Sequence, residues 1–235
     1  MQSLEQEGHL YIISVPIGNL KDISERAKER FLNVDLIACE DTRVTGKLLK
    51  NLDLQKGIPL VSYRDENERS LTESLVEKIK QGTKVALVCD AGTPAISDPG
   101  YRLINACRKE GVNITALPGP CALTNALALS GLPTDAFLFA GFLPPKRSAR
   151  QKFFREQADQ PYTLILYESC HRIEKFLEDL IAELGEKRII SICREMTKMH
   201  ESVFTGTALS VQERLLKTSK KGEFVVLIAK RKFTY

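Results

Sequence analysis

The stretch Lys84-Val-Ala-Leu-Val-Cys89 places five apolar residues in a row after a lysine, which predicts a buried β-strand. The segment that follows, Asp90-Ala-Gly-Thr-Pro-Ala-Ile-Ser-Asp-Pro-Gly100, is rich in Gly, Pro, Ser and Asp, and these residues favour turns and loops. Ligands of open α/β sheets bind outside the carboxyl ends of the strands. The stretch therefore predicts a sheet with a ligand-binding loop at its carboxyl edge.

The same alternation of strand-like and helical segments extends outward over residues 10–117. Short β-branched or apolar runs are separated by segments with apolar residues at helical spacing, and Ser24 can cap the helix that follows it. The expected strands are residues 10–15, 35–39, 60–63 and 112–117, and the expected helices are 25–33, 44–51, 71–79 and 101–110. This order implies parallel strands covered by helices, hence an α/β domain.

Pro118-Gly119-Pro120 interrupts that order and predicts a hinge. Beyond the hinge, the expected helices are residues 122–129, 146–158, 171–184 and 208–217, and the expected strands are 137–142, 163–167, 188–193, 201–206 and 224–229. Strands in direct succession indicate some antiparallel pairing. We therefore predict two α/β domains, residues 1–117 and 118–235.

The composition excludes several classes of protein. The chain has 235 residues, of which 43% are hydrophobic and 27% charged, so a disordered or fibrous protein is excluded. No apolar run reaches about 18 residues and the polar start lacks the apolar core of a secretory signal, so we expect a cytoplasmic protein. The six cysteines are far apart and form no CxxC pair, which indicates buried thiols. With three histidines, a metal site is not expected.

The positive charge is unevenly distributed. Residues 1–117 carry 16 basic and 17 acidic side chains, whereas residues 118–235 carry 18 and 13, giving net charges of −1 and +5. Five cations without an intervening acid lie within ten residues: Lys146, Arg147, Arg150, Lys152 and Arg155. This cluster fits either a phosphate-contacting surface or an ordinary solvated helix face.

Three loops rich in Gly and Pro follow predicted strands. They are Pro16-Ile-Gly-Asn19, residues 90–100 and Pro118-Gly-Pro-Cys-Ala122. Small residues allow the backbone to approach a ligand closely, and three such loops favour one shared small-molecule cleft. None of them matches GxGxxG or GxxxxGK[ST], which argues against a dinucleotide dehydrogenase and against nucleoside-triphosphate hydrolysis.

Ordered motifs along nearly the whole chain carry a resemblance to a known family. They are Leu10-Tyr-Ile-Ile-Ser-Val-Pro-Ile-Gly-Asn-Leu20, Glu40-Asp-Thr-Arg43, Asp90-Ala-Gly-Thr-Pro94, Ser97-Asp-Pro-Gly-Tyr101, Leu117-Pro-Gly-Pro120, Gly131-Leu-Pro-Thr134, Gly141-Phe-Leu-Pro144, Tyr167-Glu-Ser-Cys-His-Arg172, Arg194-Glu-Met-Thr-Lys198 and Lys221-Gly-Glu-Phe224. They resemble the tetrapyrrole methylase superfamily and, more narrowly, its members that methylate the ribose 2′-hydroxyl of a cytidine in 16S ribosomal RNA.

This resemblance implies two α/β domains with S-adenosylmethionine bound, folded up, in the cleft between them. The residues that it implies for the cofactor site are Ile17, Gly92, Thr93, Ile96, Cys121 and Ala122, with Glu168 and Met196 aligned less securely. Many members of the family continue past the last strand with a further helical segment, whereas this sequence ends there. We expect that difference to affect the grip on the ribosome more than the binding of the cofactor.

Methyl transfer to a ribose hydroxyl depends mainly on holding the oxygen in line with the methyl group. A base or a cation near that oxygen helps, and Asp41, Arg43 and Glu195 are the catalytic candidates near predicted strand ends. Asp41 or Thr42 can instead cap a helix. His171 fits the first turn of a helix capped by Ser169, and the sequence identifies no general base.

The resemblance also implies the small ribosomal subunit as partner and a homodimer. The residues expected to contact the RNA are Lys146, Arg147, Arg150, Lys152, Arg172 and Lys198. Two alternatives stay open from the sequence. One is a methyltransferase of the same fold that acts on a small molecule such as a corrin precursor. The other is a non-catalytic RNA-binding relative.

Overall fold

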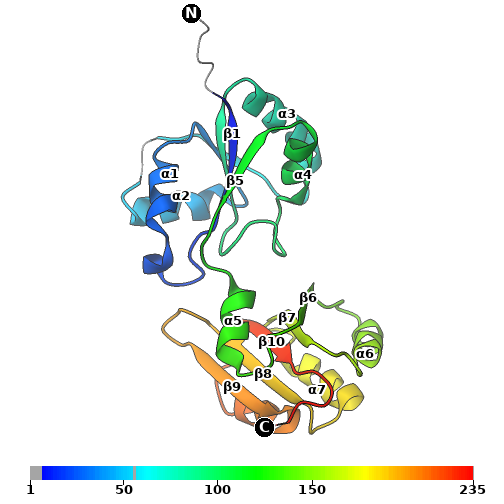
Figure 1. Cartoon of the computed structure of the whole chain (residues 1–235). Coiled ribbons are helices and arrows are strands. Elements are labelled where there is room, and N and C mark those ends of the chain that lie inside the picture. The colour runs from blue at the N-terminus through cyan, green and yellow to red at the C-terminus, as the bar shows by residue number, and fades with distance from the viewer. Residues whose placement is uncertain (1–6, 55–56, 235) are drawn as a thin grey trace, which may run out of the picture. The chain divides into compact units, whose positions relative to one another are not determined.

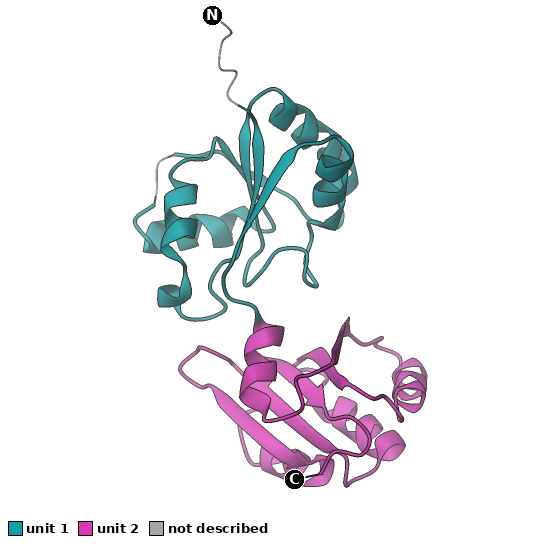
Figure 2. Ribbon diagram, viewed as in Figure 1, with its two compact units in different colours: residues 1–121 teal, residues 122–235 magenta. Residues whose placement is uncertain are grey.

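The chain forms two compact units, Met1–Cys121 and Ala122–Tyr235, coloured separately in Figure 2. The computed structural model describes residues 7–54 and 57–234. The division falls four residues after the boundary that the sequence predicts. The reason is local, because the Thr93 hydroxyl donates to the carbonyl oxygen of Pro120 at 2.9 Å and so holds the proline segment to unit 1.

Unit 1 is a parallel sheet with helices on both faces (Figure 1). Its strands are β1 (His9–Ile13), β2 (Leu36–Cys39), β3 (Leu60–Ser62), β4 (Lys84–Val88) and β5 (Asn113–Leu117), in the order β3-β2-β4-β1-β5. Its helices are η1 (Leu20–Asp22), α1 (Glu25–Phe31), α2 (Thr42–Asn51), α3 (Glu68–Lys80) and α4 (Tyr101–Lys109). Every strand pair is parallel, which confirms the α/β prediction.

Alternation along the central strands explains why both faces are covered. Leu10 packs in the cluster under α3 and α4, whereas Tyr11 and Ile13 pack on the opposite face with α1 and α2. Figure 1 shows these two helix pairs on either side of the sheet. The Ser24 hydroxyl accepts a hydrogen bond from the backbone N–H of Ala27, as expected for the cap of α1.

Unit 2 contains a mixed sheet. Its strands are β6 (Phe137–Phe142), β7 (Thr163–Ser169), β8 (Ile189–Arg194), β9 (Ser202–Thr207) and β10 (Glu223–Ile228), in the order β6-β7-β10-β8-β9. Only the β6–β7 pair among these is parallel, and the others confirm the predicted antiparallel pairing. The helices are α5 (Ala122–Ser130), α6 (Arg147–Glu156), α7 (Ile173–Leu184) and α8 (Ala208–Leu216). Helices α6, α7 and α8 share one apolar cluster with the sheet.

Some local predictions need correction. Ser169 is the last residue of β7 and does not cap a helix, because α7 begins at Ile173 with Arg172 as its N-cap. His171 therefore lies in the turn between strand and helix. Four of the six thiols are buried, whereas Cys121 and Cys170 are partly exposed. Over residues 7–54 and 57–234, no helix has the length and apolar character needed to cross a membrane.

Candidate functional site

The three Gly/Pro loops of unit 1 meet at the carboxyl ends of β1, β4 and β5. Val15 and Gly92 exchange two backbone hydrogen bonds, of 2.8 and 3.0 Å. The Thr93 hydroxyl lies 2.9 Å from the Ser14 hydroxyl and donates to Pro120 O. One threonine thus ties together the segments that the sequence suggested would share a ligand.

Two glycines allow this close approach. Gly92 has φ of +82°, and a Cβ there would lie 3.3 Å from Ile17 Cγ2. At Gly119, a Cβ would lie only 2.7 Å from the Cβ of Ser14. Larger residues at these positions would push the loops apart, so Gly92 and Gly119 allow the three segments to lie close together.

The loop over residues 90–100 has a strained backbone. Ala95 and Ser97 have φ values of +68° and +65°, a region that costs a non-glycine residue about 1 kcal/mol or more. Ile96 lies between them and keeps 36% of its surface exposed. Strain of this kind clusters at ligand sites, and here it presents an apolar side chain outward at the sheet edge.

Three acidic residues, Glu40, Asp41 and Asp90, lie near the start of α2 at the same edge. The Asp41 backbone N–H donates to Asp90 Oδ1 at 3.0 Å, and the Asp90 backbone N–H lies 3.3 Å from Glu40 Oε2. Burial raises the pKa values of Glu40 and Asp90, although both accept these backbone hydrogen bonds. The edge therefore holds carboxyl groups that bind protons more readily than usual.

Asp41 and Arg43 form one unit. Asp41 is the N-cap of α2, and its carboxylate also pairs with the Arg43 guanidinium through contacts of 2.6 and 3.0 Å. Hydrogen bonds from Arg43 hold the pKa of Asp41 well below its usual range. The capping alternative is thus observed, and the pairing with Arg43 makes the Asp41 carboxylate a weaker base than an unpaired one. Asp41 instead orients Arg43, whose side chain is 86% exposed.

Sequence reasoning assigned Asp98 only to a turn, but the structure gives it an unusual environment. Burial raises the pKa of Asp98 to about 6, and the neighbouring Glu40 and Asp90 add to this rise. Its carboxyl group lies against the Cys89 thiol, and burial raises the pKa of that thiol as well. The sequence signal was its position, the second of two acids in the loop that follows a strand with four apolar residues.

Unit 2 brings together the predicted residues at the ends of β7 and β8. Glu168 and Arg194 flank Phe224 of β10 from opposite sides in the sheet. Glu168 is 2% exposed, and burial raises its pKa despite the hydrogen bond from Ser169 N. Its Oε2 lies 3.3 Å from Arg172 Nη2 without forming a hydrogen bond in the described part of the chain.

Glu195, in the loop after β8, joins this loop to the start of β10. Its backbone is left-handed, with φ of +50°, and its Oε1 accepts hydrogen bonds from Glu223 N at 3.0 Å and Lys198 Nζ at 2.9 Å. Burial alone would raise the pKa of Glu195, but these hydrogen bonds hold it below its ordinary value. Glu195 therefore positions Lys198, and its carboxylate is poorly suited to accept a proton. Met196, next to it, is buried.

The basic helix α6 is largely neutralised by α7. Arg150 is 4% exposed, and its Nε donates to Asp179 Oδ2 at 2.8 Å. Arg147 binds the other oxygen of Asp179 at 2.9 Å, and Arg155 pairs with Glu183 at 2.8 Å. Arg150 therefore holds α6 and α7 together and is buried. This position corrects the expectation that Arg150 contacts RNA.

The other predicted RNA contacts differ in how free they are. Lys152 lies 3.7 Å from Glu156, and Lys198 pairs with both Glu195 and Glu223. Arg172 donates to Leu143 O at 2.7 Å and is partly exposed. Lys146 is exposed and forms no ion pair with any residue in the described ranges.

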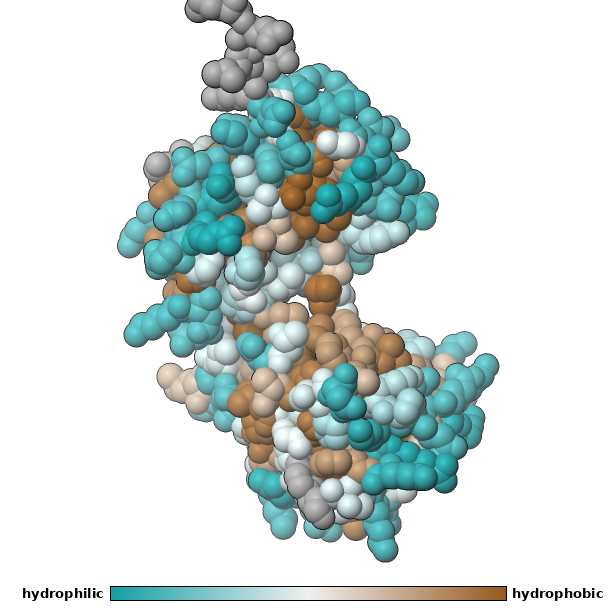
Figure 3. Space-filling view, in the orientation of Figure 1, coloured by the Kyte–Doolittle hydropathy of each residue, from teal (hydrophilic) through white to brown (hydrophobic). Residues whose placement is uncertain are grey.

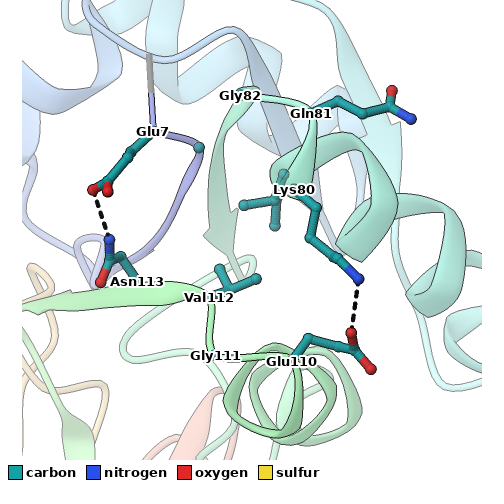
Figure 4. A pocket seen from close by; sticks show the side chains of 10 residues that line it. Glu7, Lys80, Gln81, Gly82, Glu110, Gly111, Val112 and Asn113 are labelled. Carbon is teal, nitrogen blue, oxygen red and sulfur yellow. Dashed lines mark hydrogen bonds and ion pairs between the residues drawn. The ribbon is translucent and has the colours of Figure 1, made fainter. Parts of the chain in front are cut away.

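A separate hollow of about 590 Å³ lies at the opposite, amino-terminal edge of the unit 1 sheet (Figure 4). The ends of α3 and α4 line it together with Glu7 and Asn113. Its polar side chains already bind one another, since Lys80 pairs with Glu110 at 2.8 Å and Asn113 donates to Glu7 at 3.1 Å. We assign it no function. Among the described residues, no group of His, Cys, Asp or Glu is arranged to hold a metal ion.

The parallel α/β unit with three tied loops and the unit with a mixed sheet that follows it place the chain in one family of methyltransferases. A model of the tetrapyrrole (corrin/porphyrin) methylases matches residues 9–212, and the chain belongs to this family. Two solved structures share the fold. The methyltransferase CobJ matches with a TM-score of 0.67 at 18% identity over 95% of this chain and 94% of its own. A uroporphyrin III C-methyl transferase from Thermus thermophilus matches with 0.64 at 16% identity over 95% and 98%.

Closer relatives carry a more specific name. A protein of Haemophilus influenzae named ribosomal RNA small subunit methyltransferase I is 48% identical over 94% of this chain and 78% of its own length. One of the same name from Hydrogenobaculum sp. is 44% identical over 96% of this chain and 97% of its own. A third, from Escherichia coli O157:H7, is 45% identical over 94% and 78%.

Proposed function

We propose that this chain transfers a methyl group from S-adenosylmethionine to the ribose 2′-hydroxyl of a cytidine in the decoding region of 16S rRNA. The observation that carries the proposal is the tie of three loops by Thr93, at the sheet edge where open α/β proteins bind ligands. The choice of acceptor follows the relatives, which are 44–48% identical and are named as small-subunit rRNA methyltransferases.

The loops of unit 1 suit the proposed cofactor. Ile17 and Ile96 offer apolar contacts, and Gly92 leaves backbone where a Cβ would fill the space beside Ile17. Thr93 and Cys121 complete the proposed set in unit 1. Ala122, Glu168 and Met196 are the residues of unit 2 that the family resemblance implies for the cofactor. When bound, S-adenosylmethionine supplies an electrophilic methyl group on a sulfonium.

The chain's own residues would then orient the acceptor. Arg43, held by Asp41, is exposed at the sheet edge and can bind a phosphate or a ribose oxygen. Glu195 would hold Lys198 for the same purpose. Neither carboxylate is suited to remove a proton, because the pKa of each is lowered. Catalysis by this arrangement is mainly positioning and charge stabilisation.

Contact with the RNA backbone is assigned to exposed or partly exposed cations of unit 2. These are Lys146, Lys152, Arg172 and Lys198, with a smaller contribution from Arg147 because it is bound to Asp179. We also propose a cytoplasmic homodimer. The edge strand β6 supports association, because Phe137, Leu138 and Phe142 are exposed on it.

The function is tested by methyl transfer from labelled S-adenosylmethionine to three acceptors in parallel: small ribosomal subunits, naked 16S rRNA and a tetrapyrrole precursor. We expect label in a ribose of the assembled subunit. Label in the tetrapyrrole alone would contradict the proposed acceptor while leaving the fold assignment intact.

The cofactor site is tested at Thr93. Thr93→Arg fills the space between the loops and removes both hydroxyl contacts, so we expect methyl transfer and cofactor binding to be lost. Thr93→Ser keeps the hydroxyl and should retain most activity. Calorimetric titration with S-adenosylmethionine and thermal unfolding of both variants separate loss of the site from loss of the fold. Cofactor affinity unchanged in folded Thr93→Arg would contradict the placement.

A further inference from the structure

Helix α2 carries a row of positive side chains that no acid within the helix balances. Its 10 residues include Arg43, Lys47 and Lys50 and no Asp or Glu. Spacings of four and three residues put these side chains on one face of the helix. With a rise of 1.5 Å per residue, this α2 row (Arg43, Lys47 and Lys50) is about 10 Å long, enough to meet more than one phosphate of a nucleic-acid backbone.

The two lysines of the α2 row carry charge that is available at the surface, whereas Arg43 is paired with Asp41 just outside the helix. Arg43, Lys47 and Lys50 are all exposed. Neither lysine forms an ion pair with any residue over the ranges 7–54 and 57–234. The inner face of the helix is formed by Thr45 and Leu49, so the cations are not needed for packing. Figure 3 shows hydrophilic surface over the side of unit 1 where Figure 1 places α1 and α2.

The row begins at the edge of the sheet that carries the candidate cofactor loops. Helix α2 starts directly after β2, and the hydrogen bond from Asp41 N to Asp90 Oδ1 joins its first turn to the loop after β4. A polyanion lying along α2 would therefore reach this edge of unit 1. Exposed Lys and Arg side chains in such a row make contacts with phosphates that do not depend on sequence.

We propose that the α2 row binds backbone phosphates of the RNA substrate. This assigns an RNA-binding surface to unit 1, whose overall charge is slightly negative, in addition to the contacts proposed in unit 2. The inference rests on the proposed function, because it takes the acceptor to be rRNA.

The test compares two double variants. Lys47→Ala/Lys50→Ala removes the two unpaired cations of the row, and Arg108→Ala/Lys109→Ala removes two exposed cations from the last turn of α4 in the same unit. The probe is small ribosomal subunits purified from a strain that lacks this methylation. Binding is measured over a series of salt concentrations, and S-adenosylmethionine affinity is measured separately by calorimetry.

We expect the α2 variant to bind subunits roughly tenfold more weakly at low salt, with the slope of log affinity against log salt reduced by about 1 to 2. The α4 variant should stay within about twofold of the wild type, and cofactor affinity should be unchanged in both. Suppose that the wild-type protein methylates subunits and the α2 variant binds them with unchanged affinity and salt slope. The proposed role of the α2 row is then overturned, and the proposed function stands. Equal losses in both variants would also overturn it.

A different result identifies failure of the proposed function. If the wild-type protein binds S-adenosylmethionine but neither binds nor methylates small subunits or naked 16S rRNA, the acceptor is not rRNA and the inference falls with it. Tight, salt-dependent binding to an acidic protein in place of the subunit would have the same consequence.

Discussion

Helices α2 and α6 are both rich in cations, but they differ in what those cations do. In α6, Arg147 and Arg150 bind Asp179, and Arg155 binds Glu183. In α2, Lys47 and Lys50 remain exposed without ion pairs to other described residues. Most cations of the denser cluster in the sequence are therefore paired with acids, whereas, among the described residues, two of the three cations on α2 are not. Acids about 30 residues away, on α7, decide this difference.

Packing explains the contrast. Helix α6 lies against α7, where the rings of Phe154 and Phe176 are 5.3 Å apart, and Arg150 falls on the same buried face. A buried guanidinium needs a partner because an unpaired charge in the interior is strongly unfavourable. Helix α2 buries only Thr45 and Leu49, so its cations all stay in water.

The largest effect expected from this contrast is on stability. Asp179→Asn leaves Arg150 buried without a countercharge, so we expect the free energy of unfolding to fall by about 3–5 kcal/mol. Urea denaturation measures it. Glu183→Gln removes a pair whose arginine is 57% exposed and should change stability by about 1 kcal/mol or less. Equal, small changes in both would mean that α6 does not depend on its ion pairs.

A smaller effect is expected on the pH dependence of stability. Asp179 is paired with two arginines, whereas Asp98 lies beside a thiol and other acids. The pKa of Asp98 is raised to about 6, so its protonated form is favoured in the folded state. Protonated Asp98 therefore stabilises the folded state fully below the pKa that Asp98 has in the unfolded chain. This stabilisation is lost as the pH rises through about 6.

Asp98→Asn should therefore be more stable than the wild type above about pH 7, by roughly 1–2 kcal/mol after allowing for partial exposure, and this advantage should vanish below about pH 4. Unfolding by urea across this pH range provides the measurement. Asp53→Asn, at an exposed turn, serves as the control for the change from a carboxylate to an amide. A difference between Asp98→Asn and wild type that is constant with pH would contradict the assigned environment.

The sequence predicted the order and type of the elements because local signals agreed with the fold. Apolar runs such as residues 84–89 became central strands, and Ser24 capped its helix. The helix start after β7 was placed too early. Its cap is the backbone of Arg172, and no side-chain pattern at Ser169 or His171 reveals this.

The site was less predictable because its contacts are long-range. Loops at strand ends could be expected to meet. The hydrogen bonds of the Thr93 hydroxyl to Ser14 and Pro120 join residues far apart in the sequence, and no local pattern predicts them. The burial of Arg150 depended on Asp179, which lies 29 residues further along the chain. The environment of Asp98 and the α2 row were missed because neither an acid in a polar loop nor three spaced cations stands out from an ordinary surface in the sequence.

The most direct test of the contrast measures the salt dependence of binding to small ribosomal subunits for two variants side by side. Lys47→Ala/Lys50→Ala alters α2, and Arg147→Ala/Arg155→Ala alters two exposed cations of α6 that are paired with acids of α7. We predict that the slope of log affinity against log salt falls by about 1 to 2 for the α2 variant and by less than about 0.5 for the α6 variant. The reverse order would show that α6 supplies the charge that holds the RNA and would contradict the account.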